Sequence, residues 1–337
     1  MTSPRLLVGG ALLLIVVAIL AIGFGSVAIA PGDVIGILAR QLFGAGEAAQ
    51  GAGATSIVME LRLPRILAAI LVGAALAVAG GAFQSLLRNP LADPYVLGTS
   101  SGAALGAAIA ILLPIGGVAW ELGGVQLAAF IGALASVGLV WRVAGIGSGE
   151  ERIASVLLVG YAVASLLAAA LSLVMLASGA NLRAIFSFLL GGLDGATWPR
   201  LAAAALPLIA ATTLLALRGR ALAGFLLGDE AAQHLGVDVR RERRIAVALA
   251  SLATAAAVAL AGLIGFVGLV VPHLARLAVG PDPRAVLPLS AIGGALLLLL
   301  ADTIARSLGV PVGVITALIG APFLLWLLHR ARTGYAL

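Results

Sequence analysis

Long stretches without a charged residue make up most of the chain, and short polar segments that hold the arginines and carboxylates separate them. A helix that crosses the roughly 30 Å hydrocarbon core of a membrane needs about 20 apolar residues. The stretches have about this length, so we expect them to form membrane-spanning helices. Nine such stretches occur, at Leu6–Gly32, Ile66–Leu87, Pro94–Trp120, Leu122–Trp141, Ile153–Leu182, Leu201–Leu217, Ile245–Pro272, Ala285–Ala301 and Ser307–Leu328.

The stretch Ile245–Pro272 is too long for one helix and contains Gly262, Gly265 and Gly268. We therefore expect a helix near 245–262 and a broken helix near 264–280, which raises the number of spans to ten. An even number places both termini on one side of the membrane. The sequence thus predicts an all-α integral membrane protein of about ten transmembrane helices in a single domain, residues 1–337.

The arginines indicate the orientation, because membrane proteins concentrate positive charge in their cytoplasmic loops. With the N-terminus inside, fourteen arginines fall on the cytoplasmic side and six outside, so we expect cytoplasmic termini. The N-terminal stretch and the segment 28–30 (AIA) imitate a signal peptide. The apolar stretch is much longer than the roughly 7–15 residues of a signal core, so we expect a retained first helix. The outer arginines are Arg40, Arg62, Arg65, Arg183, Arg200 and Arg306.

Composition excludes several functions. Hydrophobic residues form 62% of the chain and charged residues 10%, whereas soluble domains carry about 25% charged residues. Cysteine and lysine are absent, which excludes thiolate metal sites and a P-loop lysine, so any ATP must be hydrolysed by another subunit. We expect no catalytic residue, no metal site and no cofactor in this chain, and the net charge of +6 indicates membrane topology rather than nucleic-acid binding.

Three segments carry a family resemblance: residues 62–102 (RLPRIL to GTSSG), residues 226–244 and residues 262–276 (GLIGFVGLVVPHLAR). They strongly resemble the FecCD- or BtuC-type permeases, and the similarity extends over most of residues 60–330. These permeases are the membrane subunits of ATP-driven importers for ferric siderophores, haem and cobalamin. The resemblance implies the type II ABC importer permease architecture, in a bacterial inner membrane. It also implies three partners: an ATPase dimer that holds ATP and Mg²⁺, a periplasmic substrate-binding protein and a second copy of the chain.

Residues 226–244 are predicted to form a cytoplasmic segment between two spans. Asp229 and Glu230 favour the start of a short helix, and Gly236 suits its end. Asp238 can cap a second short helix that carries the following arginines. The residues alone also fit a solvated, positive-inside loop. In the resembling family this segment docks into the ATPase, and the residues expected to couple here are Gly228, Asp229, Glu230, Ala232, Leu235 and Gly236.

A gate or substrate path is expected at the glycine-rich segment before Pro272, because irregular backbone in a membrane must be buried in protein or line a water-filled cavity. The resemblance adds the fifth span, which lines the path at the dimer axis. His273 suggests a haem ligand, but we favour its assignment to a shared motif near the inner face. The candidates for the gate or path are Ser165, Met175, Gly265, Gly268 and Pro272.

Arg62, Arg65 and Arg306 mark the outer ends of two spans, and Asp302 precedes Arg306 by four residues, so these two can pair on one helix face. Anchoring at the membrane interface is one interpretation of these arginines. The resemblance implies another, in which Arg62, Arg65 and Arg306 receive acidic side chains of the binding protein.

The cargo implied by the resemblance is an iron chelate, haem or a ferric siderophore, with cobalamin as the alternative. A secondary transporter is a more distant alternative, since such proteins are expected to carry ionisable groups within their spans. Intramembrane enzymes are disfavoured: the zinc-protease motif His-Glu-x-x-His is absent, and acidic pairs such as Glu150-Glu151 are too few for Mg²⁺ sites.

Overall fold

The computed structural model describes residues 4–25, 27–44, 52–113, 123–144 and 150–334. Within these ranges the protein is helical and contains no strand, and eight helices are long and apolar enough to cross a membrane, with two shorter apolar helices beside them. The long ones are α1 (Pro4–Gly23), α4 (Leu63–Leu86), α7 (Gly124–Ala144), α8 (Glu150–Ala177), α10 (Trp198–Leu217), α13 (Val239–Ala261), α15 (Pro283–Leu308) and α16 (Val312–Gly334). The short ones are α5 (Thr99–Leu112) and α14 (Val267–Val279). These ten helices correspond in order to the ten predicted spans, which confirms the predicted fold class.

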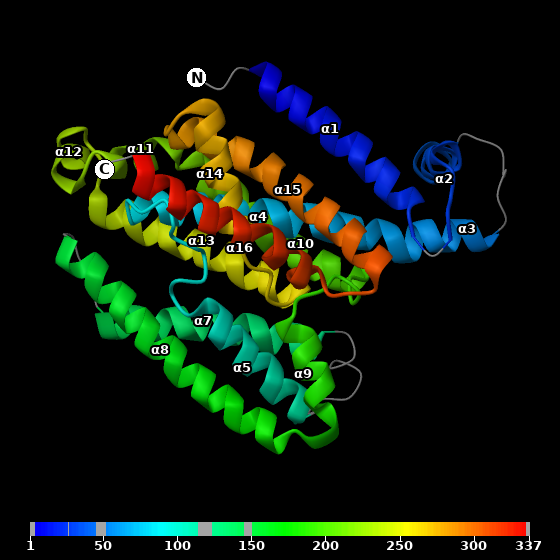
Figure 1. The fold of residues 1–337 in the computed structure, drawn as a ribbon, viewed down its shortest axis with the longest axis horizontal. Helices are drawn as coiled ribbons and strands as arrows, with labels where there is room; N and C mark the ends of the chain where they lie inside the picture. Colours follow the sequence, from blue (N-terminus) through cyan, green and yellow to red (C-terminus); the bar gives the residue numbers. More distant parts are fainter. Residues whose placement is uncertain (1–3, 26, 45–51, 114–122, 145–149, 335–337) are drawn as a thin grey trace.

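Short helices lie at both ends of the bundle. One end carries α2 (Pro31–Phe43), α3 (Ala52–Ser56), the wide helical turn η1 (Ile57–Arg62), η2 (Gly179–Asn181) and α9 (Leu182–Leu189). The other end carries α11 (Gly219–Leu226) and α12 (Asp229–His234). In Figure 1, α1 begins and α16 ends towards the side of α11 and α12. We call the end with α2 and α9 the outer end and the end with α12 the inner end.

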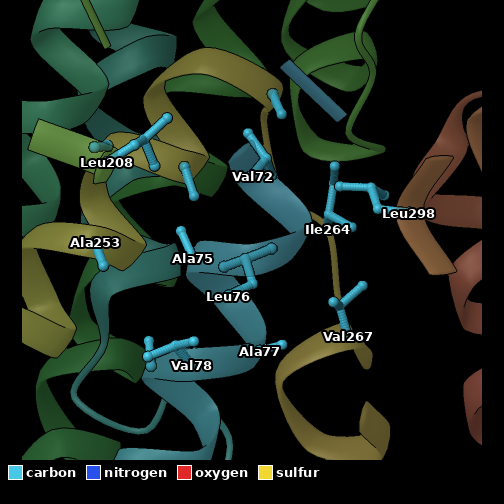
Figure 2. Packing of buried hydrophobic residues seen from close by; sticks show 14 of the residues in the cluster. Val72, Ala75, Leu76, Ala77, Val78, Leu208, Ala253, Ile264, Val267 and Leu298 are labelled. Atoms are coloured by element: carbon cyan, nitrogen blue, oxygen red, sulfur yellow. The ribbon is translucent and has the colours of Figure 1, made fainter. Parts of the chain in front are cut away.

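Helix α4 forms the centre of the molecule, and most of its side chains are buried. Figure 2 shows Val72, Leu76 and Val78 of α4 among side chains of the surrounding segments, including Leu208 of α10 and Ala253 of α13. Many of the buried residues are alanine or glycine, which lets membrane helices approach closely where lipid provides no hydrophobic drive between them.

Three boundaries differ from the sequence prediction. The second spanning helix begins at Ala52 and runs through η1 into α4, so Arg62 and Arg65 lie within a helix and not at its start. The first helix ends at Gly23, whereas the predicted apolar stretch continued to Gly32. The expected second short helix after Asp238 is the beginning of α13, which continues unbroken to Ala261, while the unpredicted α11 precedes α12.

The predicted break after α13 is confirmed. Non-helical backbone connects Ala261 to Val267, and Gly262 (φ 66°) and Phe266 (φ 69°) adopt left-handed conformations. The hydroxyl group of Tyr95 donates a hydrogen bond to the carbonyl oxygen of Ile264 (3.0 Å) and accepts one from its backbone N–H (3.3 Å). Both polar groups of this non-helical residue thus have a partner inside the protein, as a lipid environment requires.

Two glycine contacts bring α4 against its neighbours. A methyl group added at Gly73 would lie 2.2 Å from the carbonyl oxygen of Gly294 in α15, and one added at Gly80 would lie 1.8 Å from that of Gly268 in α14. Gly80→Ala is therefore expected to force α4 and α14 apart. Such overpacking costs about 1–3 kcal/mol, and the measurement is the apparent melting temperature of the purified protein in detergent, which should fall.

Gly138→Ala provides the matched control, because Gly138 lies within α7 and has no atom within 4 Å of the position that its new methyl group would occupy. This change should leave the melting temperature unchanged or raise it, since alanine is up to about 1 kcal/mol better than glycine in a helix. Equal losses in both variants would contradict the assignment of Gly80 to a close helix contact.

Candidate functional site

Three arginines and two aspartates gather at the outer end, and we call Arg62, Arg65, Asp194, Asp302 and Arg306 the outer arginine cluster. Asp302 of α15 is fully buried. Nε of Arg65 lies 3.0 Å from both of its carboxylate oxygens, and a terminal nitrogen of Arg65 lies 2.8 Å from one of them. Nε of Arg306 lies 3.3 Å from the other oxygen. The predicted pair between Asp302 and Arg306 is confirmed, and Arg65 joins it from α4.

Asp194 is the member of the cluster that the sequence analysis missed. It follows α9, its side chain is 80% exposed, and it forms an ion pair with the remaining terminal nitrogen of Arg65. The only available signal was its isolation, since it is the one carboxylate between Glu151 and Asp229. Nothing in the local pattern indicated that it would meet an arginine 129 positions earlier in the sequence.

Arg62 is directed inward and is only 6% exposed. Its guanidinium donates to the carbonyl oxygens of Ile22 (2.6 Å) and Gly23 (3.1 Å) at the end of α1, and a further nitrogen donates to Val27. Terminal carbonyls of a helix lack partners within the helix, so Arg62 satisfies the end of α1 and fixes it to α4. Arg306 contributes in the same way through the carbonyl oxygen of Ala21 (3.0 Å). Docking by Arg62 and Arg306 stays a prediction, and these internal contacts leave little of either side chain exposed.

A hollow of about 440 Å³ opens over the cluster. Arg62, Arg65, Asp194 and Arg306 line it together with Gly25, Leu61, Ala305 and the turn between α15 and α16, residues 309–311. The three arginines and two aspartates of the cluster leave a net charge of +1 at this hollow. A positively charged recess at the outer end is suited to an acidic side chain of a partner protein.

The inner end carries the predicted coupling segment. Gly228 (φ 98°) precedes α12 and Gly236 (φ 80°) follows it, and glycine adopts such left-handed conformations without strain. The carboxylate of Asp238 accepts a hydrogen bond from the backbone N–H of Arg241 (3.0 Å), which confirms the predicted helix cap. Ala232 is fully buried, whereas Leu235 is 66% exposed and Glu230 is also exposed.

Internal contacts hold α12 in place. Asp229 lies 2.7 Å from a guanidinium nitrogen of Arg243 in α13, and the same guanidinium lies 5.3 Å from the centre of the Phe225 ring. Arg218, between α10 and α11, pairs with Glu242 of α13 at 2.8 Å and fixes the neighbouring corner to the same helix. Asp229 therefore faces α13, and the exposed part of the segment consists mainly of Glu230, Leu235 and their neighbours.

The candidates for the gate or path are distributed over two regions. Ser165 is exposed and Met175 partly exposed on α8, whereas Gly268 and Pro272 are buried in α14. Gly268 packs against Pro94 and the backbone of Leu76. It is a position of close helix packing in this structure, and its role in a gate or path stays a prediction. Gly265 is partly exposed in the break between α13 and α14.

His273 packs edge-on against Phe323, with ring centroids 6.0 Å apart. Among the described residues, no group of three or more His, Asp or Glu side chains is placed to hold a metal ion. Neither observation assigns a ligand role to His273.

The buried carboxylate of Asp302 offers a test of the cluster. Asp302→Ala should leave Arg65 and Arg306 without their shared partner, and breaking a buried ion pair in this way costs about 3–5 kcal/mol. The apparent melting temperature of the purified protein should therefore fall strongly.

Asp282→Ala is the control, since Asp282 caps the same helix at its exposed inner end. Loss of a cap costs about 1 kcal/mol. The hydrogen bond from the Arg284 side chain lowers the pKa of Asp282, so the stabilisation by this cap is present at neutral pH and is lost as the pH falls. If Asp302→Ala were no worse than Asp282→Ala, the cluster would not have the structural role that we assign to it.

Comparison with known proteins agrees with this arrangement of helices. Residues 13–330 match the model of the FecCD transport family. The chain is 46% identical over 301 residues to a cobalamin import system permease of Halobacterium salinarum, covering 89% of this chain and 79% of that protein. It is 40% identical to a hemin transport system permease of Yersinia pestis, covering 98% and 97% of the two chains. A solved inward-facing structure of a metal-chelate type ABC transporter superposes with a TM-score of 0.84 at 29% identity, covering 97% of this chain and all of that one. The chain therefore belongs to the FecCD transport family.

Proposed function

We propose that this ABC importer permease moves a large metal chelate inward across the bacterial inner membrane. An iron chelate, haem or a ferric siderophore, is the first candidate for the cargo. The similarity to a hemin transport permease over almost the whole of both chains carries this choice. The greater identity to a cobalamin import permease favours cobalamin as the second candidate.

The inner end faces the cytoplasm in this proposal. Arg240, Arg241, Arg243 and Arg244 all lie at the start of α13 beside α12, and positive charge of this density favours the cytoplasmic side. The first turn of α1 and the last turn of α16 lie towards the same side (Figure 1), which supports the proposal that both termini are cytoplasmic.

A separate ATPase dimer docks on the coupling segment. Leu226, Leu227 and Leu235 are exposed around α12, and exposed apolar groups beyond the membrane commonly mark protein interfaces. The chain contains no lysine for a P-loop, so the ATP and Mg²⁺ belong to the partner. At the outer end, Arg65 and the positively charged hollow receive the substrate-binding protein.

A second copy of the chain packs along α8. Only 11% of the spanning part of this helix is buried within the protomer. Leu158, Tyr161, Leu166 and Leu173 are all exposed on it. In the dimer that we propose, these side chains meet the partner copy, and Ser165 and Met175 lie near the path between the two copies.

Uptake into liposomes tests the proposed function. The permease is reconstituted with the ATPase and the substrate-binding protein of its own organism and offered haem, a panel of ferric siderophores and cobalamin. We expect ATP-dependent uptake of one class of cargo. Leu235→Asp should reduce uptake and ATPase binding by at least about tenfold, because a charge replaces an apolar contact of the interface.

Gln233→Asp is the control for this change, since it adds the same charge to an exposed polar position of α12. We expect it to retain most of the uptake. Uptake of cobalamin alone would contradict the choice of an iron chelate, and failure of any ATPase to associate would contradict the importer assembly.

Disulfide cross-linking tests the contact along α8. The chain has no cysteine, so Leu166→Cys or Leu173→Cys introduces a single thiol in the proposed interface. We expect an oxidant to give a covalent dimer in membranes. Leu13→Cys, on the exposed surface of α1, should stay monomeric; cross-linking through Leu13 but not through α8 would place the second copy elsewhere.

A further inference from the structure

Arg65 is shared between two carboxylates in very different surroundings. Asp302 is fully buried, and Asp194 is 80% exposed. One edge of the guanidinium binds Asp302 through Nε and a terminal nitrogen, while the other terminal nitrogen binds Asp194. Because exposed ion pairs are weak and buried ones are costly to break, the two contacts differ greatly in how easily they can be exchanged.

The loop that carries Asp194 also contacts the break between α13 and α14. The backbone N–H of Gly192 donates to the carbonyl oxygen of Ala261, the last residue of α13 (2.8 Å). Gly191 (φ 67°) approaches the carbonyl oxygen of Leu263 so closely that an added methyl group would lie 2.2 Å from it. The ion pair of Asp194 therefore ties α4 to a segment that connects α9 with the non-helical part of the membrane domain.

We propose that Asp194 is a built-in competitor for the acidic side chain of the docking substrate-binding protein. On docking, a carboxylate of the partner replaces Asp194 on Arg65, while Asp302 keeps its place. Asp194 is released, and the loop loses its attachment to α4. This inference rests on the proposed docking of a binding protein at the outer arginine cluster, and it gives that docking a structural consequence inside the permease.

The charges of the cluster support this exchange. With Asp194 in place, the cluster has a net charge of +1, and release of Asp194 leaves +2 facing the partner. The hollow beside Arg65 has about 440 Å³ of space, which admits a carboxylate side chain without moving the buried residues. Arg200 donates to the carbonyl oxygen of Gly195 (3.1 Å), so the loop keeps a second attachment after the exchange.

Binding measurements test the competition. The permease in lipid nanodiscs is titrated with the substrate-binding protein of its own organism at low salt, as wild type, Asp194→Asn, Glu60→Gln and Arg65→Gln. Asp194→Asn should tighten binding about fivefold, within the usual range of such couplings, and the gain should shrink at high salt because exposed charges are screened. Glu60 is also exposed at the outer end, so Glu60→Gln removes the same charge without touching Arg65 and should change affinity much less.

The outcomes separate the two proposals. If Arg65→Gln weakens docking but Asp194→Asn does not tighten it beyond Glu60→Gln, the competition is wrong and the docking site stands. If Arg65→Gln leaves docking unchanged, the docking proposal itself is wrong.

Spin labels provide a readout of the release itself. Ser56→Cys in α3 and Leu190→Cys after α9 are both exposed positions outside the lining of the hollow, and no natural cysteine interferes. The distance distribution between the labels should change on docking, and Asp194→Asn should show the changed distribution without the partner. A distribution that stays the same in all three states would overturn the proposed release.

Discussion

Close contact between helix backbones around α4 is the constraint on which the rest of the structure depends. Lipid gives no hydrophobic drive for helices to associate, so the bundle is held by dense packing between small residues. Gly73 against Gly294 and Gly80 against Gly268 set the separation of α4 from α15 and α14. The outer arginine cluster follows from this packing, because Arg65 reaches Asp302 only when α4 and α15 lie this close.

The second constraint is that non-helical backbone in a membrane must find its hydrogen bonds within the protein. Among the non-helical segments that the structure describes are residues 87–98 before α5 and Gly262–Phe266 before α14. They meet each other: Tyr95 binds both polar groups of Ile264, and Pro94 packs on Gly268. The breaks are stabilised as a pair, and this explains how two helices shorter than the membrane thickness occur next to a central helix that spans it.

The sequence was sufficient for those features that depend on a local pattern. Ten spans, the break near Gly262, the start of α12 at Asp229 and the cap at Asp238 each follow from charge-free length, glycine position or capping chemistry. Helix boundaries at charged residues could not be predicted, because Arg62 and Arg65 interrupt an apolar stretch but continue a helix once they have partners. Those partners are the carbonyl oxygens of α1 and the carboxylate of Asp302, which lie far away in the sequence. Asp194 and Tyr95 were missed for the same reason, since their importance arises from tertiary contacts alone. The close packing of Gly268 against α4 could not be predicted either, because sequence does not distinguish a glycine that lines a path from one that permits close packing.

The two candidate sites are connected through α13. At the inner end, Asp229 binds Arg243, and this contact bridges the corner at Gly236 between α12 and α13. We therefore expect a displacement of α12 to move the start of α13 with it. Its 23 residues extend about 35 Å at 1.5 Å per residue and end at the break, where Ala261 accepts the hydrogen bond from Gly192 in the loop of Asp194. A helix that is held at its inner end and meets non-helical backbone at its outer end can change the angle at the break without losing its own hydrogen bonds. In the mechanism that we propose, the break is the place in the described structure where motion at the ATPase side and the charge exchange at Arg65 would act on the same few peptide groups.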